Sequence, residues 1–276
     1  MSNPMLRDFD GKHDGSLQPG QYGQNGQVHT YGDRQAQAPS AEQLQAQYDR
    51  PAAGAAQTGR MTLDDVVMRT SMTLGTVVAL AVVGWFVPVL AIPGAIVGLV
   101  LGLVNAFKRE PSPALILSYA AAQGLFLGGL SMIMEQTAYS GIVLQAVLGT
   151  VGVFVVVLVL TKVGVLRTSP ALTKIVLVAM LGYLVFGLVN LGLSVFAGFN
   201  MRSDVEIFGL PLGVVIGGIA ILLASYSLVM DFENIRDGIG RVASKYAWSA
   251  AFGLTVTLIW LYVEILRILS LLSNND

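Results

Sequence analysis

The chain alternates between long apolar stretches and short polar connections over most of its length. The apolar stretches fall at residues 68–88, 90–107, 113–134, 140–161, 171–197, 208–231 and 246–272. Each is close to the roughly 20 residues that an α-helix needs to cross the hydrocarbon core of a bilayer. The pattern therefore predicts an all-α membrane protein, a bundle of seven transmembrane helices in contact with the lipid bilayer.

Proline and glycine residues indicate how the helices turn and pack. Pro88, Pro93 and Gly94 lie where the first two stretches meet, with no charged residue among them, which favours a short hairpin between two helices. Small residues four positions apart, such as Gly124 and Gly128, let helix backbones approach closely within a membrane. We therefore expect a closely packed bundle rather than isolated spans.

The first sixty residues are polar and have a different composition. Glutamine, glycine, alanine, aspartate and tyrosine are frequent there, as in QPGQYGQNGQ at 18–27. Such a segment buries too little apolar surface to offset the entropy of ordering, and it lacks the basic-then-apolar pattern of a signal peptide. We expect residues 1–60 to form a disordered tail. Residues 61–276 are expected to form the transmembrane domain, beginning where Thr62 and Asp65 have the spacing of a helix capping box.

Basic residues occur in alternate connections along the chain, which predicts the orientation. They are Arg60, Arg69, Lys108, Arg109, Lys162, Arg167, Lys174, Arg236, Arg241 and Lys245. The other connections contain no basic residue except Arg202, which Asp204 and Glu206 outweigh. Because positive loops stay on the cytoplasmic side, the tail is predicted to be cytoplasmic, in the plasma or inner membrane of a cell. The seventh helix then ends outside at Asn274–Asp276.

Composition removes several classes of function. The chain has no cysteine, and both histidines, His13 and His29, lie in the tail. Disulfides, thiolate chemistry and imidazole ligands for haem or zinc within the spans are therefore excluded. A net charge of −1 argues against a nucleic-acid partner, which requires a basic face. The spans contain no Ser/Lys or His/Glu constellation at catalytic spacing, so we expect neither enzyme activity nor a bound cofactor.

Two acidic residues within the apolar stretches are the candidate functional residues. Asp231 closes the stretch IAILLASYSLVMD (219–231), and Glu264 lies within TLIWLYVEILRILSLL (257–272). Ionisable groups at membrane depth are costly and indicate ion pathways by default. Structural explanations stay open for both: Asp231 as a helix end at the water boundary, and Glu264 as the partner of Arg267 on the same helix face.

If Asp231 and Glu264 face each other, they form a pH sensor and a weak cation site. Two close carboxyl groups cannot both ionise freely, so the pair would share a proton. When ionised they offer oxygen ligands to Ca²⁺, although two carboxylates are too few for a tight cage and suit a weak site in an ion pathway. Of the other polar residues, Glu135 is predicted to lie at the membrane interface and Asn190 to make an interhelical hydrogen bond.

Four segments carry a resemblance to a known family. They are QGLFLGGLSMIMEQ (123–136), IVLQAVLGTVGVFVVVLVLTK (142–162), VMDFENI (229–235) and LYVEILRILSLL (261–272). Together they resemble the Bax-inhibitor-motif family, also called the transmembrane Bax inhibitor motif proteins, in a bacterial form. The resemblance implies seven helices around a central sixth or seventh helix. It also implies a pH-sensitive calcium leak gated by two acids, here Asp231 and Glu264.

The chain also departs from the pattern of that family. Gln123 stands where many relatives have an acid, and Phe232 and Glu233 replace Thr-Gln after the aspartate. The segment between the two acids is also longer than in typical relatives, by about two helical turns. If it turns at Gly238–Gly240, Glu264 lies further from the turn than Asp231, by about 10 Å or more.

Two functional hypotheses follow. The leading one is a pH-sensitive calcium (cation) leak channel in which Asp231 and Glu264 are the ion pathway, the pH sensor and a weak Ca²⁺ site. Calcium is then the transported ion rather than a bound cofactor. The alternative is a non-conducting membrane regulator that interacts with a membrane protease or stress-response partner, with the N-terminal tail as the contact.

Overall fold

A computed structural model describes residues 59–207 and 209–273 of the chain. Within these residues seven helices are long and apolar enough to cross a membrane, which confirms the predicted class and number of spans. The spans are α2 (Leu63–Phe86), α3 (Ala91–Phe107), α4 (Pro113–Thr137), α5 (Ile142–Lys162), α6 (Pro170–Ala197), α8 (Leu212–Gly238) and α9 (Ala247–Ser273). The shorter elements are η2 (Pro88–Leu90), α7 (Met201–Asp204), β1 (Glu206–Ile207), β2 (Leu210–Pro211) and η3 (Ser244–Tyr246). The predicted tail lies outside the described residues except for its last two, as does the predicted outer end at Asn274–Asp276.

The connection between the first two spans is tighter than predicted. α2 ends at Phe86, and the turn η2 leads directly into α3, which begins at Ala91. Pro93 and Gly94 therefore belong to the first turn of α3 and not to the loop. Proline is tolerated there because the N–H it lacks would have no acceptor within the helix.

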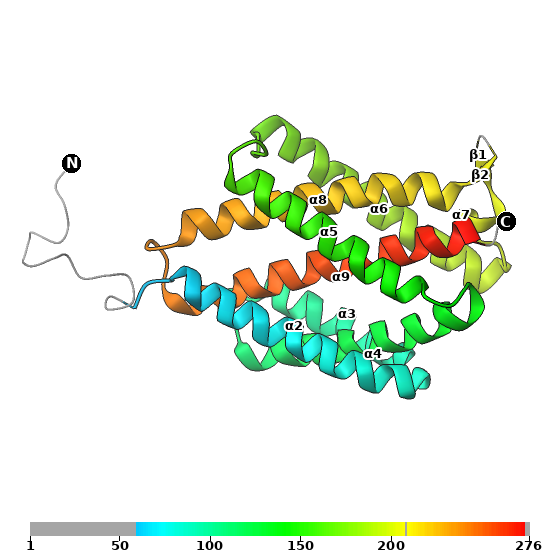
Figure 1. Cartoon of the computed structure of the whole chain (residues 1–276), viewed down its shortest axis with the longest axis horizontal. Coiled ribbons are helices and arrows are strands. Elements are labelled where there is room, and N and C mark those ends of the chain that lie inside the picture. The colour runs from blue at the N-terminus through cyan, green and yellow to red at the C-terminus, as the bar shows by residue number, and fades with distance from the viewer. Residues whose placement is uncertain (1–58, 208, 274–276) are drawn as a thin grey trace, which may run out of the picture. The chain divides into compact units, whose positions relative to one another are not determined.

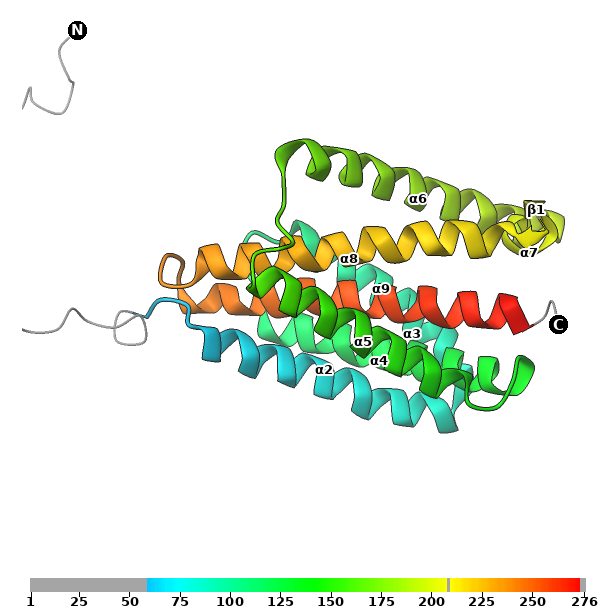
Figure 2. The ribbon, with the colours of Figure 1, turned by 45° about the horizontal axis from the view of Figure 1, so that its top comes forward.

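α9 is the central helix of the bundle. It contacts α8, α2, α5 and α4, and Figures 1 and 2 show it running between α8 and α2. Its buried Leu261 packs in one cluster with Leu228 of α8 and Val157 of α5. The neighbouring pair α8 and α9 carries both acids of interest, Asp231 and Glu264.

Glycines allow α2 and α4 to pack backbone against backbone. A Cβ atom on Gly124 would lie 2.5 Å from the backbone oxygen of Val77, and one on Gly128 would lie 2.7 Å from the carbonyl carbon of Ala81. No side chain fits at either position. The contact confirms the close packing that the spacing of these glycines predicts, since small residues let membrane helices approach.

α6 stands apart from the core of the bundle. Its main contacts are with α8 and α7. Figure 2 shows it on the side of α8 that faces away from α9. Val176 and Asn190 are the buried residues of this helix. Its exposed side chains are largely leucine, valine and phenylalanine, as expected for a helix that faces lipid.

The residues before α2 form a strap, Gly59–Met61, across the loop between α8 and α9. The N–H of Met61 donates to the oxygen of Val242 at 2.8 Å, and its carbonyl accepts from the N–H of Gly240 at 2.9 Å. The side chain of Met61 is buried.

We call this end of the bundle, where α2 and α9 begin and α8 ends, the basic end, and the opposite end the distal end.

Replacing Thr62 by alanine is expected to destabilise the protein by about 1 kcal/mol. The hydroxyl of Thr62 accepts from the N–H of Asp65 at 3.1 Å, and the Asp65 carboxylate accepts from the N–H of Thr62 at 3.0 Å. The predicted capping box is thus present, and the substitution removes one half of it. Thermal unfolding in detergent, followed by circular dichroism, measures the loss. Thr76→Ala in the interior of α2 is the control, and an equal loss there would contradict the capping role.

Candidate functional site

Asp231 lies in α8, about 10 Å before the helix ends at Gly238. Its partly buried carboxyl group accepts a hydrogen bond from the hydroxyl of Thr257 at 2.8 Å. Gly253, one turn earlier in α9, leaves room for it, since a Cβ atom there would lie 3.3 Å from Oδ1. Among the described residues no basic side chain forms an ion pair with Asp231. A carboxyl group at this depth without a counter-ion is available to a cation or a proton.

Asp231 faces a cavity of about 310 Å³ at the basic end. Asn234, Ser249 and Tyr246 contribute further polar side chains to its walls, and Met61 of the strap forms part of the lining. The cavity therefore combines one acid with several neutral oxygen-bearing groups. Such a lining suits a hard cation, which is bound through oxygen atoms.

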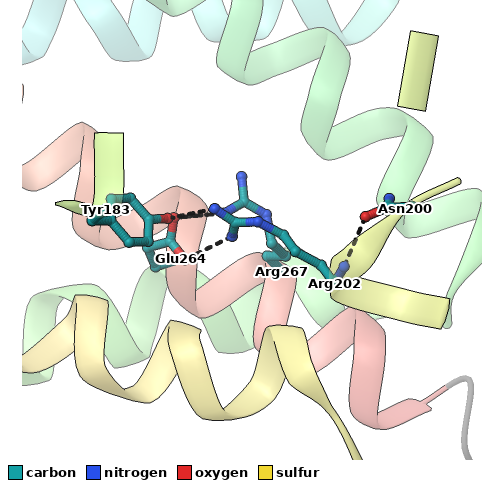
Figure 3. Close-up of polar contacts among 5 residues, drawn as sticks. All are labelled: Tyr183, Asn200, Arg202, Glu264 and Arg267. Carbon is teal, nitrogen blue, oxygen red and sulfur yellow. Dashed lines mark hydrogen bonds and ion pairs between the residues drawn. The ribbon is translucent and has the colours of Figure 1, made fainter. Parts of the chain in front are cut away.

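Glu264 lies in the distal half of α9, about 25 Å after the helix begins at Ala247. Its side chain is almost fully buried, with 1% exposed. Its Oε1 accepts hydrogen bonds from the hydroxyl of Tyr183 and from Nη1 of Arg267, the latter at 2.6 Å. Its Oε2 lies 3.7 Å from Nη1 of Arg202 (Figure 3). The pairing with Arg267 is the structural alternative that the sequence left open, and here it is one part of a larger cluster.

Arg202 reaches Glu264 because the short helix α7 turns it into the bundle. The side chain of Asn200 caps this helix by accepting the N–H of Arg202 at 3.1 Å, as Figure 3 shows. The guanidinium lies 5.3 Å from the ring centres of both Tyr183 and Phe186. Sequence reasoning treated Arg202 as a loop residue and overlooked Tyr183. One sequence feature did single out Arg202. It is the one basic residue in the connections predicted to lie on the outer side of the membrane.

The structure does not bring Asp231 and Glu264 together, which corrects the prediction of a paired site. α8 and α9 are antiparallel neighbours, and the two acids differ by about 15 Å in their distance from the turn that joins the helices. Asp231 lies opposite Thr257, whereas Glu264 lies opposite Gly217, where a Cβ atom would be 3.7 Å from Oε2. A shared proton or a shared Ca²⁺ site is therefore not formed in this conformation. The acids lie apart because the long segment that joins them places Glu264 further from the turn than Asp231.

An apolar layer separates the two acids. Leu228 of α8 and Leu261 of α9 are fully buried and pack together with Val157. Leu228 lies within one helical turn of Asp231, and Leu261 lies within one turn of Glu264. Close-packed apolar side chains leave no room for water or ions. Packed apolar side chains therefore lie between the two acids.

Glu264 lies on a second, larger cavity of about 920 Å³. Side chains of α4, α6 and α9 form its walls, and Arg202 of α7 lines its distal end. Gln123 of α4 also lines this cavity. The two acids thus face different cavities, one toward each end of the bundle.

Asn190 is buried beside the larger cavity, but its Oδ1 has no hydrogen-bond partner among the described residues. The predicted interhelical hydrogen bond through that oxygen is therefore not formed.

Glu135 accepts the backbone N–H groups of Gly141 and Val143 at 2.5 and 3.1 Å. It caps the start of α5, which is compatible with its predicted place at the membrane interface.

The described part of the chain brings no three Asp, Glu, His or Cys side chains together in a group that could hold a metal ion. Ca²⁺ takes six to eight oxygen ligands, so Asp231 would supply only part of a calcium shell. Neutral side chains, backbone carbonyls and water would supply the rest.

Comparison with known families points to the same family as the four sequence segments. The family model described as Bax inhibitor 1 like matches residues 23–274. Comparison with curated proteins gave no match. The matched region includes every described span, together with Asp231 and Glu264. The chain therefore belongs to the Bax inhibitor 1 like family, as a membrane protein with seven transmembrane helices.

Proposed function

We propose that this protein is a passive, pH-sensitive pathway for cations, with calcium as the transported ion, and that the conformation described here is closed. The observation that carries the proposal is Asp231. Its carboxyl group lies within a transmembrane helix, faces a cavity at the basic end and has no basic partner among the described residues. An ionisable group at this depth is costly to maintain, and such groups characteristically serve ion or proton routes.

Asp231 would bind a calcium ion weakly and lose it readily. One carboxylate supplies the charge, and the oxygens of Thr257 and Asn234 lie nearby to complete part of the shell. Conduction requires this balance, because an ion that binds too tightly does not leave. The same carboxyl group can take a proton instead, so acid competes with calcium at this position.

Glu264 has a different role from Asp231 in this proposal. Arg267 and Arg202 both oppose its charge, so it is poorly placed to attract a cation. It holds α7 to α9 at the distal end and thereby stabilises the closed bundle. Opening would require the layer formed by Leu228 and Leu261 to separate, so that an ion at Asp231 reaches the larger cavity.

The orientation follows from the positive residues at the basic end. Arg60 and Arg69 both bond to the connection between α8 and α9, and Lys245 forms an ion pair with Glu110 in the loop between α3 and α4. Positive residues stay on the cytoplasmic side of a membrane. We therefore place the basic end on the cytoplasmic side, so that the Asp231 cavity faces the cytoplasm, with the protein in the plasma or inner membrane of the cell.

Asp231→Asn is expected to reduce calcium flux into vesicles holding the purified protein by about tenfold or more. The amide keeps the size of the side chain but removes its charge, and a loss of ~1.4 kcal/mol in ion binding corresponds to tenfold. A calcium-sensitive dye inside the vesicles measures the flux. Lowering the pH is expected to reduce the wild-type flux, because protons compete for the same carboxyl group. The pH profile of the variant should be flatter.

Asp237→Asn is the matched control for this experiment. It changes the same residue type in the same helix, but the Asp237 side chain is 66% exposed and lies beside Arg236. Its flux and pH profile are expected to equal those of the wild type. An unchanged flux in Asp231→Asn would remove Asp231 from the pathway. An absence of flux in the wild type would contradict the pathway itself.

A non-conducting regulator of a membrane protease or stress-response partner is the second candidate function. The strap is the observation that favours it, because Gly59–Met61 joins the preceding chain to the loop between α8 and α9, beside the Asp231 cavity. A partner bound to the tail would be coupled to the bundle through this contact. Under this alternative, vesicles with the wild type and with both variants carry no calcium flux.

A further inference from the structure

The cluster around Glu264 contains more positive than negative charge. Arg202 and Arg267 both face this single carboxylate, and the hydroxyl of Tyr183 bonds to all three side chains. Arg267 contacts Oε1 at 2.6 Å, whereas Arg202 stays 3.7 Å from Oε2. The charge of Arg202 is therefore the less well neutralised of the two.

Arg202 also has a hydrogen-bond donor without an acceptor. Its side chain is only 9% exposed, and its Nη1 has no hydrogen-bond partner among the described residues. Its Nη2 donates to Tyr183 at 3.1 Å. A buried donor without an acceptor is costly, and the planar guanidinium fits a carboxylate or a phosphate particularly well. Nη1 makes only the longer ion pair with Glu264, and Arg202 lines the larger cavity, so its guanidinium is placed to meet an anionic group that enters there.

The rest of this cavity is apolar and long. Its walls are mainly aliphatic and aromatic side chains such as Phe126, Leu188 and Ile259. It follows α9 from Val256 to Leu271, about 22 Å, which exceeds the ~15 Å of one leaflet of the hydrocarbon core. Its volume of about 920 Å³ lies within the range of ligand sites. A small inorganic anion would fill little of this space.

We propose that the larger cavity binds an anionic amphiphile, with its carboxylate or phosphate group at Arg202 and its acyl chain along α9 toward Val256. Entry from the bilayer is possible because α6 makes its main contacts with α8 and α7 and faces lipid. Glu264 lies beside the position of the charged group and opposes binding, while Arg267 and Tyr183 offset its charge. This site lies in a different cavity from Asp231, and the proposal does not require that the protein conduct ions.

Quenching of tryptophan fluorescence tests the proposal on the full-length protein in a neutral maltoside detergent. The probe is dibromostearate, an anionic fatty acid whose bromine atoms quench nearby indole rings. Trp260 lines the cavity, so saturable quenching is expected, and Trp260→Phe should remove it. Arg202→Gln is expected to weaken binding by about tenfold or more, the equivalent of one lost charge-assisted contact. Glu264→Gln is expected to tighten binding several-fold, because it removes the opposing charge.

The opposite signs of these two effects distinguish a binding role from a structural one. Arg236→Gln changes an arginine at the basic end whose side chain is 61% exposed, and its binding should equal that of the wild type. Circular dichroism establishes that each variant is folded. If Arg202→Gln does not fold, Arg202→Lys replaces it and is expected to weaken binding by a smaller factor, because lysine keeps the charge but not the fork.

Four results would overturn the proposal. The first is unchanged binding in the folded Arg202 variant, and the second is weaker binding in Glu264→Gln. The third is equal quenching by the uncharged methyl ester of dibromostearate, which would show apolar partitioning alone. The fourth is displacement of the fatty acid by millimolar inorganic phosphate, which would show a site for free anions rather than for amphiphiles.

Discussion

Replacing Gly128 by alanine is expected to lower the free energy of unfolding by about 3 kcal/mol, at the upper end of the usual range for overpacking. The added Cβ atom would lie 2.7 Å from the carbonyl carbon of Ala81 and 2.8 Å from the backbone nitrogen of Trp85, and closer still to the Ala81 oxygen. These are backbone atoms of α2, so no side-chain rotation relieves the clash. Either the two helices separate or α2 distorts. Chemical unfolding in detergent, followed by circular dichroism, measures the change.

Gly182→Ala is the matched control for the Gly128 variant. Gly182 lies in the interior of α6, and a Cβ atom there would meet nothing within 4 Å. The substitution is expected to leave stability unchanged or to raise it by up to about 1 kcal/mol, because alanine is the better helix former. An equal loss in both variants would show that close packing of α2 on α4 does not explain the effect at Gly128.

Glu264→Gln is expected to lower the free energy of unfolding by about 3 kcal/mol, the lower end of the range for removing one member of a buried ion pair. Glutamine keeps the shape of the side chain but removes the only acidic group that faces Arg202 and Arg267 in the described cluster. Arg202 would then hold a buried charge without a counter-ion. The same unfolding experiment measures this loss, and an excess of bound anionic amphiphile should reduce it.

Glu110→Gln provides the control for the Glu264 variant. Glu110 forms an ion pair with Lys245 at a similar distance, 2.7 Å, but both side chains are exposed. Exposed ion pairs contribute little to stability, so the effect should be much smaller than at Glu264. In addition, Arg202→Gln combined with Glu264→Gln should cost less than the sum of the two single losses. Additive losses would contradict a direct coupling between these two side chains.

The spans were predictable because lipid imposes a simple requirement on composition and length. The apolar stretch at 171–197 corresponds closely to α6, and the stretch at 113–134 to α4, which continues to Thr137. The exception is informative. The stretch that ends at Asp231 continues as helix through the polar residues to Gly238, because a helix needs only its own backbone hydrogen bonds and can extend into water.

The candidate site was only partly predictable. Glu264 and its pairing with Arg267 follow from local sequence, since residues three apart share a helix face. Tyr183 and Arg202 come from other elements that are distant along the chain. Their contact with Glu264 depends on the packing of α6 and α7, and no local spacing specifies that packing.

Run length and local spacing in the sequence are sufficient to predict the number of spans, the helix cap at Thr62 and the presence of two acids within the spanning helices. The separate cavities at Asp231 and Glu264, and the inward turn of Arg202, become visible only in the folded bundle. These outcomes depend on how far each antiparallel helix extends from its turn and on which neighbours it packs against. Both are properties of the whole bundle, in which a shift of a few residues along one helix changes every contact that it makes.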